Sequence, residues 1–459
     1  MELDTGNTAW ILASAALVLL MTPGLAFFYG GMTRSKSVLN MMMMSFGAMG
    51  VVGIIYVLWG YSMSFGPDAF GEGKAGLFGN PFHYWALHGL MPDDDAANGF
   101  ANSLLGANGV PSLVAVGFQL TFAIITVALI SGAIADRVKF STWLVFTGVW
   151  VTLAYFPLAH MVWGGGFLSG NPGGLAAKLF GLNDDGTTAV APIDFAGGTV
   201  VHINAGVAGL VLAIIIGKRK GFGKEPMKPH NLTLVMLGAA LLWFGWFGFN
   251  AGSAGAANGA AGLAWVNTTV ATCGAMVGWL IIEKLRDGHA TTLGAASGVV
   301  AGLVAITPAA GNLTPVGSII LGVVAGGVCA MAVSLKYKLG YDDSLDVVGV
   351  HLVGGLIGTI GIGFLATGTG LFYGGGIKQL IVQIVIALAA VVISGVVTTV
   401  IGLVLKSTMG WRIATEDEVE GIDVVVHGEQ AYDFETSGSG HGVLSASLSK
   451  STAPSEVNA

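Results

Sequence analysis

The sequence predicts an all-α integral membrane protein with eleven transmembrane helices, and three observations carry this prediction. Of the 459 residues, 54% are hydrophobic and only 10% are charged, whereas a soluble domain carries about 25% charged residues. Apolar runs of about 20 residues, the length that crosses a bilayer, recur along the chain. Basic residues gather in alternate connecting loops, as they do in multi-pass membrane proteins.

The apolar runs divide the chain into eleven expected spans. In order they lie at 8–31, 38–65, 112–135, 140–162, 196–217, 232–250, 259–284, 293–309, 315–337, 345–367 and 379–405. The residues before the first run, 1–4, are acidic where a secretory signal is basic, so we expect the first run to remain as a helix. The 73 glycines are expected to allow close contacts between helices.

The loops that follow odd-numbered spans hold fifteen basic residues: Arg34, Lys36, Arg137, Lys139, Lys218, Arg219, Lys220, Lys224, Lys228, Lys284, Arg286, Lys336, Lys338, Lys406 and Arg412. The alternate loops hold only Lys74, Lys178 and Lys378. Because basic loops stay in the cytoplasm, the N-terminus is expected outside and the C-terminus inside. We therefore divide the chain into a transmembrane domain, 1–406, and a cytoplasmic tail, 407–459, whose end is rich in serine.

Two spans contain a histidine within the same local pattern. The pattern His-x3-Gly-x2-Gly occurs at His202 in span five and again at His351 in span ten, each time after an aspartate, Asp194 and Asp346. Spans five and ten are equivalent if spans one to five and six to ten form two inverted five-helix repeats, with the eleventh helix added. Transport sites lie at the interface of such repeats. The alternative is a chance match between glycine-rich helices.

An ionisable side chain inside a span is costly and is treated as a functional candidate. Imidazole can accept or pass on a proton near neutral pH. We therefore predict that His202 and His351 line a pore as a pair. The alternative is that each is a hydrogen-bonded residue of the helix core.

Aromatic residues cluster near the expected outer ends of three spans: Phe118 and Phe122 in span three, Trp163 in span four, Trp246 and Phe249 in span six. A hydroxyl follows them at Ser253. Aromatic faces beside a hydroxyl acceptor suit a small cation that donates hydrogen bonds. The alternative is an aromatic belt at the membrane surface.

The sequence lacks the motifs of potassium filters, of nucleotide-binding proteins and of metal sites. It has no Thr-Val-Gly-Tyr-Gly filter, no P-loop, no HExxH and no Cys/His cluster at metal-binding spacing. We therefore expect no enzyme activity, no cofactor, no metal and no nucleic-acid partner. Cys273 and Cys329 lie in apolar runs and are expected to be buried thiols.

Six motifs resemble the ammonium transporter (Amt/Rh) family, and specifically its bacterial Amt branch. They are Pro23-Gly-Leu-Ala-Phe-Phe-Tyr-Gly-Gly31, Phe118-Gln-Leu-Thr-Phe122-Ala, Ala159-His-Met-Val-Trp163-Gly-Gly-Gly, the stretch from Asp194 to Gly209 that continues to Gly217-Lys-Arg219, Trp246-Phe-Gly-Phe249-Asn-Ala-Gly-Ser253, and Asp342-Asp-Ser-Leu-Asp346 to His351. The resemblance extends from about residue 8 to 435.

The resemblance implies a role for each candidate residue. Trp163, Phe122 and Ser253, with Phe118 beside them, would form an outer ammonium recruitment site. Phe122 and Phe249 would be the stacked gate below it, and His202 and His351 would share a proton in the pore. Asp194 and Trp246 would support these sites, although Asp194 is equally suited to cap the start of span five.

The resemblance also implies an activity and partners. The protein would recruit ammonium, with methylammonium as an analogue, deprotonate it and conduct ammonia, with or without the proton. The family is trimeric with one pore per subunit, lies in the bacterial cell membrane, and in bacterial relatives binds a PII-type signalling protein at its cytoplasmic face. Two alternatives are an ammonium receptor, disfavoured by the short chain after Lys406, and a gas channel of the Rh type, disfavoured by Trp163 and Ser253.

Overall fold

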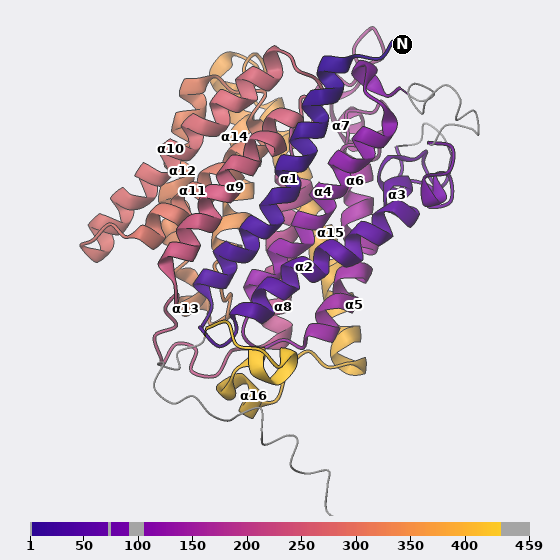
Figure 1. The fold of residues 1–459 in the computed structure, drawn as a ribbon. Helices are drawn as coiled ribbons and strands as arrows, with labels where there is room; N and C mark the ends of the chain where they lie inside the picture. Colours follow the sequence, from indigo (N-terminus) through magenta and orange to yellow (C-terminus); the bar gives the residue numbers. More distant parts are fainter. Residues whose placement is uncertain (1, 72–74, 91–104, 433–459) are drawn as a thin grey trace, which may run out of the picture.

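The structure is a computed structural model that describes residues 2–71, 75–90 and 105–432. In this described part of the chain, eleven helical segments are long and apolar enough to cross a membrane. They pack side by side as one bundle (Figure 1). The fold class expected from the sequence is confirmed, and each span begins and ends within three residues of its expected bounds.

Several spans combine an α-helix with a 3-10 or π-helical turn, labelled η. In chain order the spans are α1 (Thr5–Met32); α2 (Val38–Ile55), η1 (Tyr56–Gly60) and α3 (Tyr61–Phe65); α4 (Ser112–Ile130) and η5 (Ser131–Ile134); α5 (Phe140–Trp150), η6 (Val151–Tyr155) and α6 (Phe156–Val162); η7 (Gly198–Ile203) and α8 (Asn204–Ile216); α9 (Leu232–Gly252); α10 (Gly259–Asp287); α11 (Thr292–Ile306) and η8 (Thr307–Ala309); α12 (Pro315–Ala332) and α13 (Leu335–Leu339); η9 (Val348–Leu352) and α14 (Val353–Leu365); and α15 (Lys378–Thr408).

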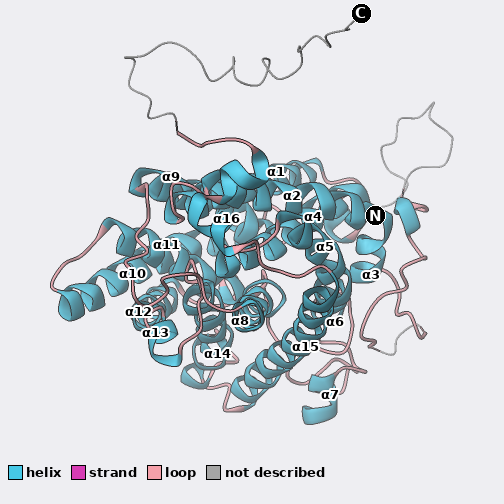
Figure 2. Cartoon of the chain, turned by 90° about the horizontal axis from the view of Figure 1, so that it is seen from below, coloured by secondary structure: helices cyan, strands magenta, loops and turns pink. Residues whose placement is uncertain are grey.

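The bundle has two ends, named here by the chain terminus near each. The N-terminal face carries the start of α1 and the short helix α7 (Leu175–Phe180). The C-terminal face carries α16 (Thr415–Glu420) and the π-helical turn η11 (Asp423–His427). Figure 2 views the C-terminal face and shows α16 lying across the bundle. Helix α15 lies at the edge, where it packs on α8, α14 and α5.

The two histidine spans begin in the same way. His202 lies in the π-helical turn η7 and His351 in the π-helical turn η9. An aspartate stands eight residues before each histidine, Asp194 and Asp343, and its carboxylate accepts hydrogen bonds from the first backbone N–H groups of that span. The two histidine spans therefore share a backbone conformation as well as a sequence pattern.

The structure corrects one part of the expected repeat, because Asp343 and not Asp346 is the counterpart of Asp194. The carboxylate of Asp346 instead pairs with the ammonium group of Lys336 at 2.6 Å. Burial raises the pKa of the Asp343 carboxyl to about 6, and this increase is opposed by the nearby Lys336 charge. The sequence pattern placed an aspartate before each histidine, but only the backbone shows which carboxylate caps the turn.

Glycines bring α10 and α12 into close contact, as the composition led us to expect. A Cβ atom at Gly322 would lie 2.1 Å from the carbonyl oxygen of Ala271, and one at Gly326 would lie 2.0 Å from that of Ala275. Small residues spaced four apart on both helices thus let the backbones touch.

The expectation for the cysteines is half correct. Cys329 is buried, but Cys273 is exposed on the surface of α10. A helix surface that faces lipid is as apolar as one that faces the protein core. An apolar sequence context therefore cannot separate these two environments.

Replacing Gly326 with Val should destabilise the bundle, because the new side chain would clash with a backbone carbonyl that cannot rotate away. Overpacking of this kind costs about 1–3 kcal/mol. Gly50→Val is the matched control, since no described atom lies within 4 Å of a Cβ built at Gly50. We expect a lower thermal unfolding midpoint for Gly326→Val alone in detergent, and equal midpoints for both variants would contradict this account.

Candidate functional site

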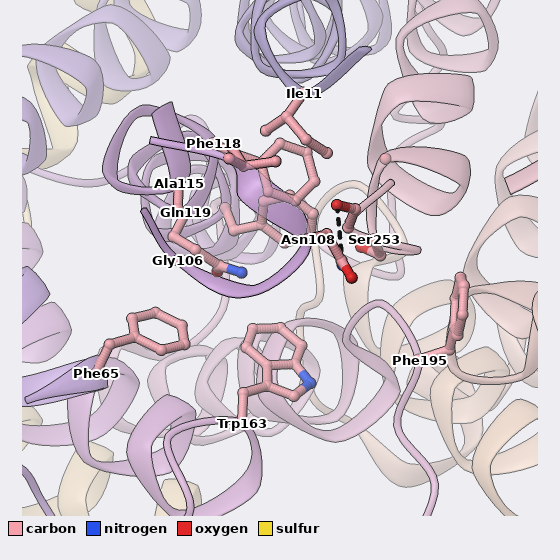
Figure 3. A pocket seen from close by; sticks show the side chains of 14 residues that line it. Ile11, Phe65, Gly106, Asn108, Ala115, Phe118, Gln119, Trp163, Phe195 and Ser253 are labelled. Carbon is pink, nitrogen blue, oxygen red and sulfur yellow. Dashed lines mark hydrogen bonds between the residues drawn. The ribbon is translucent and has the colours of Figure 1, made fainter. Parts of the chain in front are cut away.

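A pocket of about 340 Å³ opens at the N-terminal face. Its lining includes all four residues expected at the outer site, namely Phe118, Phe122, Trp163 and Ser253. Figure 3 shows Trp163 across the pocket from Phe118 and Gln119, with Ser253 at one side. These residues come from α4, the end of α6 and the end of α9, so three spans converge on one site.

The aromatic rings of the pocket meet edge to face. The ring of Phe122 lies 4.9 Å from that of Phe118 and 6.1 Å from that of Trp163, measured between centroids. All three rings line the pocket. The Ser253 hydroxyl donates to the carbonyl of Phe249 at 2.8 Å, which leaves its oxygen lone pairs as acceptors.

Two stacked rings lie between the pocket, which Phe122 lines, and the cavity below it, which Phe249 lines. Phe122 and Phe249 lie 4.1 Å apart with an interplanar angle of 20°. Both side chains are buried. The pair expected as a gate is thus in contact and separates the pocket from the space below it.

Below this stack lies a narrow apolar cavity of about 10 Å³, which touches both histidines. A volume of this size is at the lower limit for one water molecule. Nδ1 of His202 lies 3.2 Å from Nδ1 of His351, so one of these nitrogens carries a proton while the other accepts it. The buried Nε2 of His202 has no hydrogen-bond partner among the described residues.

Trp246 supports the histidine pair from one side. Its ring stacks on His202 at a centroid distance of 5.5 Å and an interplanar angle of 16°. Its indole N–H donates to the Thr307 hydroxyl at 2.8 Å. The orientation of Trp246, and with it the face presented to His202, is therefore fixed by η8.

Asp194 makes contacts of both kinds that the sequence left open, at the start of the His202 span and at the pocket. Its carboxylate accepts hydrogen bonds from four successive backbone N–H groups, of Gly197, Gly198, Thr199 and Val200, and from the Thr199 hydroxyl. Negative charge at this end of a helix is favourable because of the helix dipole. Its backbone carbonyl accepts the Trp163 indole N–H at 2.9 Å. One residue thus caps the His202 span and orients the pocket tryptophan.

Some lining residues were not singled out from the sequence. Gln119 lines the pocket, and its buried Oε1 has no partner among the described residues. The sequence could have indicated Gln119, because it is a polar residue inside an apolar run and follows Phe118. Phe65, at the end of span two, and Phe195, in the segment before span five, also line the pocket. Their place there depends on how distant segments pack, which no local pattern predicts.

A buried cluster of charges lies at the C-terminal face. Arg219 pairs with Asp342 at 2.8 Å and with Asp136 at 3.3 Å, and Asp136 also pairs with Arg34. Burial acts to raise the pKa of Asp342, but the hydrogen bonds and charge of Arg219 outweigh it and hold this pKa below its usual value. Burial lowers the pKa of Arg137 to about 10. These ion pairs connect the loops after spans one, three, five and nine, which hold Arg34, Asp136, Arg219 and Asp342 in that order.

A bundle of eleven spans that leads from an aromatic pocket to two buried imidazoles defines a multi-pass membrane transporter. The profile of the Ammonium Transporter Family matches residues 9–432. An ammonium transporter of Mycobacterium tuberculosis strain H37Rv is 55% identical over 449 residues, covering 94% of this chain and 91% of the relative. The chain belongs to the Ammonium Transporter Family.

Solved structures show the same fold. Mep2 of Candida albicans superposes with a TM-score of 0.77 at 29% identity, covering 91% of this chain and 88% of that chain. A structure described as a sensor Amt protein superposes with a TM-score of 0.76 at 27% identity, covering 91% and 97%. The family and the mycobacterial relative are ammonium transporters and not enzymes.

Replacing Asp194 with Asn should lower stability, because the new NH2 group would face backbone N–H donors. Losing charge-assisted hydrogen bonds costs about 1.5–3 kcal/mol each. Asp185→Asn is the control, since this exposed carboxylate bonds only Thr187. We expect a lower thermal unfolding midpoint for Asp194→Asn and an unchanged one for Asp185→Asn. If the two substitutions had the same effect, the capping role would be wrong.

Proposed function

We propose that this protein transports ammonium by binding it in the outer pocket, removing its proton and conducting ammonia, with or without the proton, past the two histidines. One observation carries the proposal: the aromatic pocket, the stacked Phe122–Phe249 pair and the facing imidazoles follow one another along a single path.

The outer pocket suits ammonium in charge and in hydrogen bonding. Aromatic faces attract a cation by about 0.5–2 kcal/mol each, depending on how far it is desolvated. The oxygens of Ser253 and Gln119 are acceptors for N–H groups. Phe118, Phe122 and Trp163 supply the rings, so we assign recruitment to these five residues.

Crossing the gate requires the loss of charge. An unpaired cation in a dry apolar cavity costs several kcal/mol even after the protein relaxes. Neutral ammonia avoids this cost and still offers hydrogen bonds to the imidazoles. Potassium has no proton to lose, so the same barrier excludes it without a size filter.

The histidines offer a place for the released proton or for the hydrogen bonds of ammonia. Their Nδ1 atoms are 3.2 Å apart. When the proton between them moves to the other Nδ1, the ring that gains it releases its Nε2 proton and the other ring takes one up at its own Nε2. The exchange therefore reverses which Nε2 atom can donate. Trp246 holds the ring plane of His202 during this exchange. Whether the proton follows ammonia to the other side decides whether transport carries current.

We also propose the arrangement in the membrane. The N-terminal face lies outside and the C-terminal face lies in the cytoplasm of a bacterial cell membrane, in keeping with the basic loops. Residues 1–406 form the transport domain and 407–459 the cytoplasmic tail. The protein assembles as a homotrimer with one pore per subunit, as the family resemblance implies.

A PII-type signalling protein is the proposed partner at the C-terminal face. Contacts of the described part of the tail support this proposal: the Asp423 carboxylate accepts from the backbone N–H groups of Leu39 and Asn40 at 3.0 and 2.8 Å. The Glu418 carboxylate accepts from the backbone N–H of Lys220 at 2.7 Å. The tail thus contacts the cytoplasmic loops that a partner would cover.

Replacing either pore histidine with Leu should reduce transport about tenfold or more, or remove the discrimination against potassium. Each change leaves the remaining imidazole without its partner, at a cost of roughly 1–3 kcal/mol for an unsatisfied buried polar group. The measurement is ammonium-evoked current and methylammonium uptake in proteoliposomes, with protein that elutes as the native oligomer. His289→Leu, on an exposed loop, is the control. Wild-type rate and selectivity in both His202→Leu and His351→Leu would show that the histidines are structural.

Deleting residues 412–459 should change the transport rate or abolish its inhibition by a PII-type protein, because the docked segment is lost. Deleting only 433–459 is the control, since the contacts of Glu418 and Asp423 remain. Uptake and binding of the PII-type protein are measured for both truncations. Equal uptake and retained binding after the longer deletion would refute a role for the docked tail.

A further inference from the structure

A buried glutamine on α15 holds the segment that leads into Asp194. The side chain of Gln383 is fully buried, and its Oε1 accepts the backbone N–H of Ile193 at 2.9 Å. Its Nε2 donates to the backbone carbonyl of the same residue at 2.8 Å. The carboxamide therefore bonds both backbone polar groups of one residue, Ile193, as a neighbouring β-strand would.

The remaining hydrogen-bonding capacity of Gln383 is also used. Nε2 donates to the Thr359 carbonyl of α14 at 3.1 Å, and Oε1 accepts from Gln379 at 3.2 Å. A carboxamide has two donor hydrogens and two acceptor lone pairs, so all four positions are filled. Gln379 in turn donates to the carbonyl of Ala191 at 3.1 Å. Two glutamines one helical turn apart thus fix the backbone of 191–193.

The fixed segment leads directly to the outer pocket. The next residue is Asp194, whose carbonyl orients the Trp163 indole and whose carboxylate caps the His202 span. Gln383 also contacts α14, the helix that continues from the His351 turn. A single side chain therefore sets the position of the pocket wall of the first repeat relative to a helix of the second.

We infer that Gln383 is a positioning residue for the ammonium pocket, which gives α15, the helix outside the two repeats, a part in setting substrate affinity. The inference rests on the proposed function, since it assigns Gln383 to the recruitment step of that transport. It assigns no contact between Gln383 and the substrate. Its effect is transmitted through Ile193 and Asp194 to Trp163.

The experiment is methylammonium uptake into proteoliposomes by Gln383→Met, which keeps the length of the side chain and removes its hydrogen bonds. We expect the half-saturating concentration to rise about three- to tenfold, the effect of about one net hydrogen bond. The maximal rate per assembled protein should stay within about twofold of the wild-type rate. Gln379→Met leaves both bonds to Ile193 and should give a smaller rise.

Thr398→Val is the matched control on the same helix. Thr398 is also fully buried, and it accepts an interhelical hydrogen bond from the Trp150 indole at 2.9 Å, away from the pocket. This variant loses a buried bond of α15 without touching the segment before Asp194. Its half-saturating concentration should equal that of the wild type, even if its thermal unfolding midpoint falls.

A double variant separates positioning from general stabilisation. If Gln383 acts through Trp163, adding Gln383→Met to Trp163→Leu should raise the half-saturating concentration by much less than the product of the two single effects. An unchanged half-saturating concentration in Gln383→Met, or fully multiplicative effects, would overturn the inference. Should Gln383→Met fail to assemble, Gln383→Asn, which shortens the reach by one methylene, must show the same rise.

The outcomes for the inference and for the proposed function differ. Absence of ammonium-dependent uptake by the unaltered protein would overturn the proposed function, and the inference with it. If the unaltered protein takes up methylammonium and both Gln383 variants keep the wild-type half-saturating concentration, the inference alone would be overturned.

Discussion

The lack of water in a bilayer is the constraint on which this structure depends, because a polar group inside a span must find a protein partner or cost several kcal/mol. Gln383 in α15 follows this rule, since its two donor and two acceptor positions are all occupied. The Asp194 carboxylate, just before the His202 span, accepts five hydrogen bonds. Other buried side-chain atoms of the described residues lack a partner, and those that line the pocket and the cavity below it are Oε1 of Gln119 and Nε2 of His202. Unpaired positions along the proposed path are where a substrate with N–H groups gains most.

The capping aspartates explain how two distant histidines come to face each other. Asp194 and Asp343 each satisfy the first N–H groups of a span that starts inside the bundle rather than at its surface. Each span then opens with a π-helical turn that carries its histidine. Because spans five and ten run in opposite directions, these turns approach from opposite ends and bring the two Nδ1 atoms to 3.2 Å. Transport sites of inverted repeats likewise lie at the repeat interface.

Much of the fold could be predicted from the sequence because span length and the distribution of basic loops are local properties. The site residues could be assigned from motifs, and the structure brings Phe118, Phe122, Trp163 and Ser253 to one pocket. The features that the sequence did not predict depend on contacts between segments that are far apart in the chain. The choice of Asp343 over Asp346, the exposure of Cys273, and the grip of Gln383 on Ile193 each require knowing which helices are neighbours.

The contacts divide the proposed path into a rigid part and a movable part. Trp163 is held by a hydrogen bond to Asp194, and Trp246 by one to Thr307. Phe122 and Phe249 have no polar side-chain atoms, so only packing and stacking hold their rings in place. Rotating them breaks no side-chain hydrogen bond, which suits them to the gate role proposed above. In the proposed mechanism, affinity depends on the fixed tryptophan and passage depends on the two phenylalanines.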